Sequence, residues 1–418
     1  MALSFRRFAL VSLAAGLVAV APAQAIEETD IEESIAELLP QRMRDPAEEE
    51  DASTRQWAVL PQLGYGPDTG PLVGAKFTHR NLFGAGTTLD LDSTYSLNNQ
   101  WKVAIGIEQP HIANDQFLVA FRARYRFDPQ REFFGLGNNE QGPDPASTNS
   151  FQDASAFLTF GWRPVPTLAL NATVGIRNVH IGSGDLRNSC GPDVPCPFTR
   201  EAFPDLPGVD GGTVTPIALS LVWSTRNEVV RPTSGWRGIL KVVHTNKDLG
   251  SDFEYTRYIG DLGYLRSFWE DRFIAGLRID GEWVAGPTEA VPYWELAELG
   301  GDDTMRGFFP HRFVGQGRAL VNLELKALIT EFDFFDIWHV KIDGVVFGDG
   351  GRVFLDKNDA ENEFHLDSDI FERIVSNFRY SYGGGLRFAL GEALTARVDV
   401  GFSDEETGLV YLAFGHTF

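Results

Sequence analysis

One arginine stands out as a side chain whose surroundings could give it a specific partner. Arg306 lies between Met305 and Gly307, in a loop rich in glycine and aspartate that starts at Leu299. The same stretch runs on into an alternating apolar and polar segment over 317–330. A loop this polar on a protein surface would be solvated. We predict instead that it folds back into a β-barrel and that Arg306 meets a buried carboxylate there, since guanidinium and carboxylate form strong, charge-assisted hydrogen bonds.

The two cysteines form a second pattern that could carry chemistry. Cys190 and Cys196 enclose the short segment Gly-Pro-Asp-Val-Pro. In an oxidising compartment a close pair of this kind predicts one disulfide rather than two free thiols. A metal site would need further ligands, and none lie nearby in the sequence. We therefore expect no metal.

Histidines that could act in catalysis are scattered rather than grouped. None lies beside a clear nucleophile, and the Gly-x-Ser-x-Gly elbow of the hydrolases is absent. We expect a protein that is not an enzyme and that needs no cofactor. The histidines considered are His111, His180, His244, His311, His339, His365 and His416.

The first 25 residues have the pattern of a secretory signal peptide. Arg6 and Arg7 supply positive charge, residues 8–20 form a short apolar run, and Ala23-Gln24-Ala25 has the small-x-small form of a cleavage site. An uncleaved anchor is the alternative, but the run is short for a spanning helix. We expect cleavage after Ala25 and export of the chain.

Charge and hydrophobicity limit what the exported chain can be. The formal net charge of −22 argues against nucleic acid as a partner, because phosphate binding needs Lys and Arg on the contact surface. Acidic residues are concentrated in 26–55, where Ile31, Ile35 and Leu38 also have helical spacing. This segment is either a short amphipathic helix that docks on the barrel mouth or a solvated tail. After Ala25 no apolar run is long enough for a transmembrane helix.

From Trp57 onward the chain divides into short alternating segments separated by turn residues. Within 319–329, for example, Val321 and Leu323 share one face while Asn322 and Glu324 share the other. Alternation between a lipid-facing and a lumen-facing row is typical of a transmembrane barrel wall. The sixteen predicted strands are 56–65, 69–80, 85–96, 99–109, 115–127, 149–162, 167–180, 213–226, 235–246, 252–266, 271–285, 317–330, 336–349, 377–389, 392–402 and 408–418.

The connections between these strands alternate in length. If the N-terminus lies in the periplasm, the even connections are short periplasmic turns and the odd ones face outside. The four longest connections are all odd: 128–148, 181–212, 286–316 and 350–376. The terminal Phe418, at the end of an alternating last strand, resembles the sorting signal of outer-membrane barrels. The sequence therefore predicts an all-β protein of the bacterial outer membrane. Residues 56–418 form a sixteen-stranded antiparallel barrel, and the Arg306 loop folds inward between strands eleven and twelve.

Several motifs, in order, resemble one family of outer-membrane barrels. Met305-Arg306-Gly307-Phe308 is similar to the Val/Ile-Arg-Gly-Phe/Tyr loop of the BamA/TamA outer-membrane assembly and surface-antigen superfamily. The resemblance covers roughly 56–418. It also rests on Pro232-Thr233-Ser234-Gly235-Trp236, Val222-Trp223-Ser224-Thr225-Arg226, Phe347-Gly348-Asp349-Gly350-Gly351, Leu323-Glu324, Leu63-Gly64-Tyr65 with Thr69-Gly70, and Gly415.

The resemblance implies roles for particular residues. Arg306, with Gly307 and Phe308 beside it, is expected to enter the lumen and pair with Glu324 and Asp349, which holds the loop in place. A weak seam between the first and last strands is expected to open sideways. Pro61, which has no N–H to donate, and Gly64, Gly415 and Phe418 lie at that joint.

The resemblance also implies a function and leaves an alternative open. Members of that family carry periplasmic transport-associated domains before the barrel, whereas residues 26–55 are fewer than one such domain, so a barrel-only member is expected. The first hypothesis is a barrel that assists insertion or translocation of proteins or lipids at the seam. The alternative is a passive pore or structural barrel plugged by its loop. Expected partners are outer-membrane lipids, unfolded outer-membrane proteins as clients and the general barrel assembly machinery; a monomer is expected.

Overall fold

The structure is a computed structural model that describes most of the chain from residue 56 onward. The described ranges are 56–83, 86–138, 144–184, 195–228, 230–287, 290–334, 338–365, 370–390 and 394–414. The predicted signal peptide, the acidic segment 26–55, Gly415 and Phe418 lie outside these ranges.

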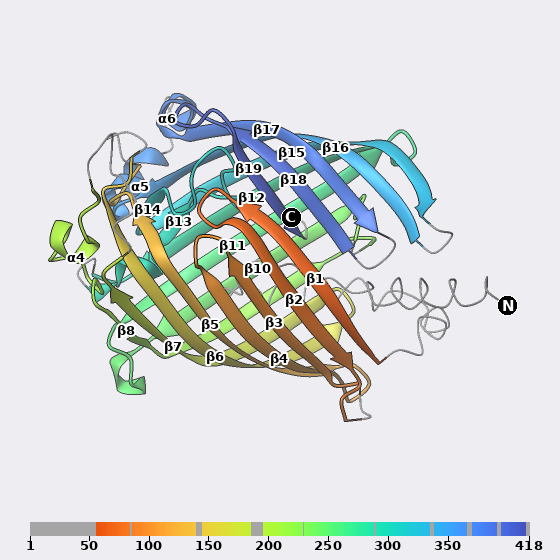
Figure 1. The fold of residues 1–418 in the computed structure, drawn as a ribbon, viewed down its shortest axis with the longest axis horizontal. Coiled ribbons are helices and arrows are strands. Elements are labelled where there is room, and N and C mark those ends of the chain that lie inside the picture. The colour runs from red at the N-terminus through yellow and green to blue at the C-terminus, as the bar shows by residue number, and fades with distance from the viewer. Residues whose placement is uncertain are drawn as a thin grey trace.

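The strands form one antiparallel sheet that closes on itself as a sixteen-stranded barrel (Figure 1), so the predicted fold class is confirmed. The four-residue strand β8 and the longer β9 lie in line and share the eighth position, because Pro216 interrupts the ladder where it has no N–H to donate. In order around the wall, the strands are β1 (Trp57–Gly66), β2 (Gly70–Arg80), β3 (Thr88–Ser96), β4 (Trp101–Ile112), β5 (Phe117–Phe133), β6 (Ser147–Val165), β7 (Leu168–Gly182), β8 (Gly211–Val214), β9 (Pro216–Ser224), β10 (Gly235–Thr245), β11 (Tyr255–Phe268), β12 (Phe273–Ala285), β15 (Gly317–Phe334), β16 (Trp338–Phe354), β17 (Arg379–Leu390), β18 (Leu394–Phe402) and β19 (Leu409–Phe414).

The wall follows the period-two pattern of its sequence. Along β6, Leu158 and Phe160 face outward and are about half exposed, whereas Thr159 between them is buried and faces the lumen. Aromatic side chains gather at both ends of the outer surface. Trp101 and Tyr125 lie 5.0 Å apart near one end, and Trp223 and Trp236 stack at 6.4 Å near the other. Girdles of this kind flank the apolar band of outer-membrane barrels.

The two ends of the barrel differ in their connections. At one end, here called the turn end, β1 begins and neighbouring strands are joined mostly by short turns. At the other, the loop end, long connections carry small elements that the strand pattern did not predict. These are α4 (Thr199–Ala202), η1 (Lys247–Leu249), η3 (Tyr293–Glu295), β13 (Ala297–Leu299), β14 (Phe313–Gly315), α5 (Lys357–Glu363) and α6 (Ile370–Asn377). No helix in the described part of the chain is long and apolar enough to cross a membrane.

Predicted strand bounds differ from the observed ones chiefly at the loop end. β5 extends to Phe133 and β16 to Phe354, several residues beyond the predicted limits of 127 and 349. In both cases the extra residues pair with a neighbouring strand. The predicted connections 128–148 and 350–376 are therefore partly wall.

Candidate functional site: a lumen loop and a seam

Arg306 lies inside the barrel against two carboxylates of the wall. It belongs to residues 286–316 between β12 and β15, here called the lumen loop. Arg306 donates from Nε to Asp349 Oδ2 at 3.0 Å and from Nη2 to Asp349 Oδ1 at 2.6 Å. Its Nη1 donates to Glu324 Oε1 at 2.5 Å. None of these three side chains is exposed to solvent.

The strand pattern explains why these carboxylates point at the loop. Glu324 on β15 and Asp349 on β16 occupy inward positions, and the two strands are neighbours in the wall. The backbone N–H of Arg306 also donates to Asp349 Oδ2 at 3.1 Å, and its guanidinium carbon lies 3.5 Å from the centre of the Phe347 ring. The arginine is therefore held by its backbone, by its charge and by an aromatic face.

Further polar groups balance the buried charge. Arg387 Nη2 donates to Glu324 Oε1 at 3.1 Å, and Lys326 Nζ lies 3.4 Å from Glu324 Oε2. Asn322 donates to Asp349 Oδ1 at 2.8 Å. Because every carboxylate in this cluster has a cationic or amide partner, loss of one member leaves another buried charge uncompensated.

Gly307 and Phe308 bring the loop backbone against the last strands of the wall. A Cβ on Gly307 would lie 2.3 Å from the carbonyl oxygen of Phe402, so the position accepts no larger residue without movement. Phe308 is fully buried, and its ring meets that of Phe313 edge to face at 5.0 Å. Its carbonyl oxygen accepts a hydrogen bond from the Tyr411 hydroxyl of β19 at 3.1 Å.

The lumen loop makes further ion pairs with the C-terminal part of the wall. Arg397 of β18 donates to Asp302 at 2.6 Å and to Asp303 at 2.9 Å. Arg312 donates to Glu405, in the connection between β18 and β19, at 2.7 Å. Arg397 and Arg312 are almost completely buried. These pairs extend the contact surface around Arg306 to the hairpin that ends the barrel.

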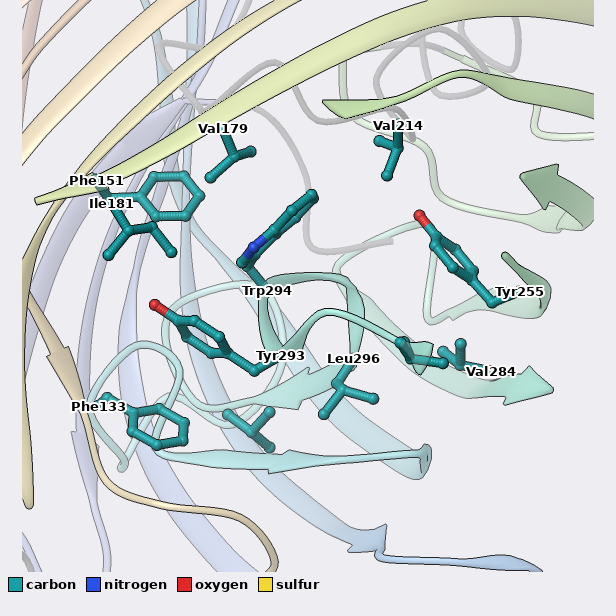
Figure 2. Packing of buried hydrophobic residues seen from close by; sticks show 12 residues of the cluster. Phe133, Phe151, Val179, Ile181, Val214, Tyr255, Val284, Tyr293, Trp294 and Leu296 are labelled. Carbon is teal, nitrogen blue, oxygen red and sulfur yellow. The ribbon is translucent and has the colours of Figure 1, made fainter. Parts of the chain in front are cut away.

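The opposite side of the lumen loop is anchored by Glu295. Its Oε1 accepts from Arg177 of β7 at 2.5 Å, and its Oε2 accepts from Arg257 of β11 at 3.0 Å. Around it lies a cluster of buried apolar side chains at the loop end of the lumen. Figure 2 shows Tyr293 and Trp294 of the loop surrounded by side chains of the wall. The cluster comprises Phe133, Phe151, Val179, Ile181, Val214, Tyr255, Val284, Val291, Tyr293, Trp294, Leu296 and Val314.

Glu298, on β13, connects the loop to a third part of the wall. It accepts a hydrogen bond from Arg131 of β5 at 2.9 Å and contacts His311 of the same loop. Burial opposes ionisation of Glu298, but His311 and Arg131 outweigh it and hold the pKa of this carboxyl well below its ordinary value. The carboxylate is therefore charged at neutral pH.

The seam lies between β1 and β19. Among the described residues, Tyr65 and Leu412 are the pair that stands in register across it. Gly64 lies at this contact, since a Cβ there would be 3.4 Å from the carbonyl oxygen of Leu412. Pro61 faces outward on β1 and stands opposite Ala75 of β2.

The remaining sequence predictions concern the cysteines and metal binding. Cys196 is buried, but Cys190 lies outside the described residues, so the disulfide stays a prediction. Within the described ranges, no group of three or more His, Cys, Asp or Glu side chains could hold a metal ion.

The structure thus brings Arg306, Gly307, Phe308, Glu324 and Asp349 together in the lumen, apart from Pro61 on the outer wall. Sequence reasoning missed Glu295, Glu298 and the arginines that face them. A signal was present, since the segment Pro-Tyr-Trp-Glu-Leu-Ala-Glu-Leu at 292–299 is too apolar for a solvated outer loop.

Solved structures of low sequence identity share the fold. BamA from Haemophilus ducreyi lacking POTRA domains 1–3 aligns with a TM-score of 0.60 and 15% identity, over 87% of this chain and 71% of that one. CdiB from Escherichia coli aligns with a TM-score of 0.58 and 13% identity, over 87% and 64%. CdiB from Acinetobacter baumannii gives 0.54 and 11%, over 85% and 58%. The chain thus spans about three fifths of each CdiB.

Comparison at the level of sequence gives the family. No curated protein matches the chain. The sequence profile of the Omp85 superfamily domain, in contrast, matches residues 81–418, which is most of the barrel. Together with the sixteen-stranded wall, this match shows that the chain belongs to the Omp85 superfamily.

Proposed function

We propose that this protein is an outer-membrane barrel that assists the insertion or translocation of proteins or lipids at the seam between β1 and β19. In this proposal the turn end faces the periplasm and the loop end faces outward. The barrel works by lateral opening and by its effect on the surrounding lipid rather than by catalysis. Arg306 holds the lumen loop in place while the seam moves.

The sparse pairing of β1 with β19, over the part of the seam that the structure describes, is the observation that carries this proposal. Elsewhere neighbouring strands pair over long ladders; β5 and β6, for example, pair from Phe117 opposite Trp162 to Phe133 opposite Ser147. β19 is described as far as Phe414, and over that length the seam has the single register pair Tyr65 and Leu412. Exposing unpaired backbone groups to hydrocarbon is costly, so a barrel opens at least cost where the fewest ladder bonds break.

A cross-link across the seam tests the proposal. Tyr65→Cys with Leu412→Cys should allow a disulfide that keeps β1 and β19 together. Val73→Cys with Tyr95→Cys is the matched control, because these outward residues are register partners on β2 and β3. The purified barrel in proteoliposomes is given a urea-unfolded outer-membrane barrel protein, and its folding is followed by gel mobility. Transfer of a fluorescent phospholipid between leaflets is followed in parallel.

We expect the oxidised seam variant to lose activity in one of these two assays and to regain it on reduction. The β2–β3 control should behave as the wild type does. Full activity with the seam cross-linked would contradict the proposal.

The filled lumen favours a second candidate, a structural barrel plugged by its own loop. The apolar cluster around Trp294 and the ion pairs of Arg306 occupy the lumen from two sides. Planar-bilayer recordings separate this candidate from a pore, because a steady large conductance would contradict a plugged barrel. No activity in either assay above, together with a closed barrel, would favour the structural role.

A further inference from the structure

The turn end has one long connection, and it crosses part of the opening. Residues 225–234 join β9 to β10 and are here called the strap. Arg231 of the strap donates from Nε and Nη2 to the two carboxylate oxygens of Asp343, both at 2.8 Å. Asp343 lies on β16, and β11, β12 and β15 lie between β10 and β16 in the wall. The strap therefore reaches past three strands to make a buried, bidentate ion pair.

A second contact joins the strap to β18, a strand closer to the seam. The hydroxyl of Thr395 on β18 donates to the carbonyl oxygen of Val230. The strap itself is ordered by Asn227, whose side-chain oxygen accepts from the backbone N–H groups of Thr233 and Ser234 at 3.0 Å each. The strap thus links the middle of the wall to β18 at the turn end.

The lumen loop contacts β18 and its hairpin partner β19 at positions nearer the loop end. The Arg397 pairs with Asp302 and Asp303 fix β18. A Cβ on Gly401 of β18 would lie 2.0 Å from the carbonyl oxygen of Arg306, so the two backbones are in direct contact. On β19 the hydroxyl of Tyr411 donates to the carbonyl oxygen of Phe308.

On the other side of the seam, the described polar contacts of inward side chains join nearby strands. Gln62 of β1 donates to Asp92 of β3 at 2.8 Å, and Lys102 of β4 lies 3.3 Å from the same carboxylate. Thr78 of β2 donates to Asp90 of β3 at 2.5 Å. These contacts run along the wall, whereas those of β18 and β19 reach segments that cross the lumen or its mouth.

We propose that the strap and the lumen loop hold the β18–β19 hairpin as a fixed half of the seam, so that movement at the seam is carried by β1. Tyr411 is the positioning residue on β19, because it joins the seam strand itself to the lumen loop. Arg231 is its counterpart at the turn end. This inference rests on the proposed opening of the seam and adds which strand moves.

Distance measurements between spin labels test the proposal in the full barrel reconstituted in lipid nanodiscs. Labels at Leu63 on β1 and at Val410 on β19 are each paired with one at Leu158 on β6; all three side chains face outward and are exposed. In the wild type we expect a broad or two-component distribution for the β1 pair and a narrow one for the β19 pair. A β19 pair as broad as the β1 pair would overturn the proposal.

Variants of the holding residues give an independent measurement. Tyr411→Phe removes one hydrogen bond and should raise the displaced population of the β19 pair by about 2- to 10-fold. Arg231→Gln removes a buried bidentate ion pair and should raise it by at least as much. Both variants should leave the β1 pair unchanged. The controls are Tyr382→Phe on the outer face of β17 and Glu228→Gln, an exposed position of the strap. Variants that leave the β19 pair unchanged would overturn the proposal. Two narrow wild-type distributions would instead contradict the proposed opening, and the variants would still decide whether the hairpin is held.

Discussion

Two sectors of the wall have the same alternating pattern but differ in the partners and the exposure of their inward-facing charged side chains. In the C-terminal sector, β15–β19, Glu324 and Asp349 pair with an arginine that the lumen loop brings across the barrel, and none of the three side chains is exposed. In the N-terminal sector, β1–β4, Lys76 and Asp90 lie 3.6 Å apart on adjacent strands with 13% and 31% of their side chains exposed, and Lys102 and Asp92 lie 3.3 Å apart with 6% and 9% exposed. Water therefore reaches the Lys76 pair but not the Arg306 cluster.

The difference indicates which contacts make one sector of this barrel more rigid than the other. A buried ion pair fixes its members strongly, because loss of either partner leaves an uncompensated charge at low dielectric. A partly exposed pair contributes little, because solvent screens it. The strand ladder is common to both sectors, so the contacts across the lumen are what distinguish the C-terminal sector.

The largest difference in stability is expected between substitutions of two cationic side chains, one in each sector. Arg306→Ala should lower the free energy of unfolding by about 3–5 kcal/mol, because it leaves Glu324 and Asp349 buried with one partner fewer. Lys76→Ala, its counterpart in the N-terminal sector, should cost no more than about 1 kcal/mol. Urea unfolding in lipid vesicles, read by gel mobility, measures both. Equal losses would remove the distinction between the sectors.

An intermediate loss of stability is expected where the backbone of the lumen loop touches the wall. Gly401→Ala places a methyl group 2.0 Å from the carbonyl oxygen of Arg306, so loop or strand must move. We expect a loss of about 1–3 kcal/mol, the usual cost of overpacking. Gly348→Ala on β16 is the control, since nothing lies within 4 Å of the added Cβ. A Gly401→Ala variant as stable as the control would show that the contact is not tight.

The smallest effect concerns the pH dependence of the Glu298 anchor. Because the pKa of Glu298 is held below its ordinary 4.5, the stability it contributes is fully present above that pH and is lost as the pH falls toward the lower folded-state value. The difference in urea midpoint between wild type and Glu298→Gln should therefore shrink as the pH falls below 4.5. A difference that grows over that acidic range would contradict the assignment of Arg131 and His311 as the partners of Glu298.

The wall could be predicted from sequence because its signal is local. Alternation such as that of Val321 to Lys326 places each side chain on a face without knowledge of distant residues. The positions of Arg306, Glu324 and Asp349 came from a family resemblance supported by the same alternation. The structure adds the distances and the complete burial that make their contact specific.

The other anchors depend on contacts that the local pattern does not encode. Glu295 and Arg177 are 118 residues apart, and Arg231 and Asp343 are 112 apart. Each pair meets only after the sheet has closed, so alternation along one strand cannot identify the partner. The helices α5 and α6 were missed because the length of their connection, rather than its composition, guided the prediction.

Hydrogen–deuterium exchange in lipid nanodiscs tests most directly the claim that the two sides of the seam differ in rigidity. Backbone amides of β18, and those of β19 that pair with β18, should exchange slowly in the wild type, whereas those of β1 that pair with β2 should exchange faster, because β1 carries the movement. Arg306→Ala should raise exchange in β18 and β19 and leave β3 and β4 unchanged. Slow exchange in β1 equal to that in β19, or faster exchange in β19 than in β1, would contradict the account.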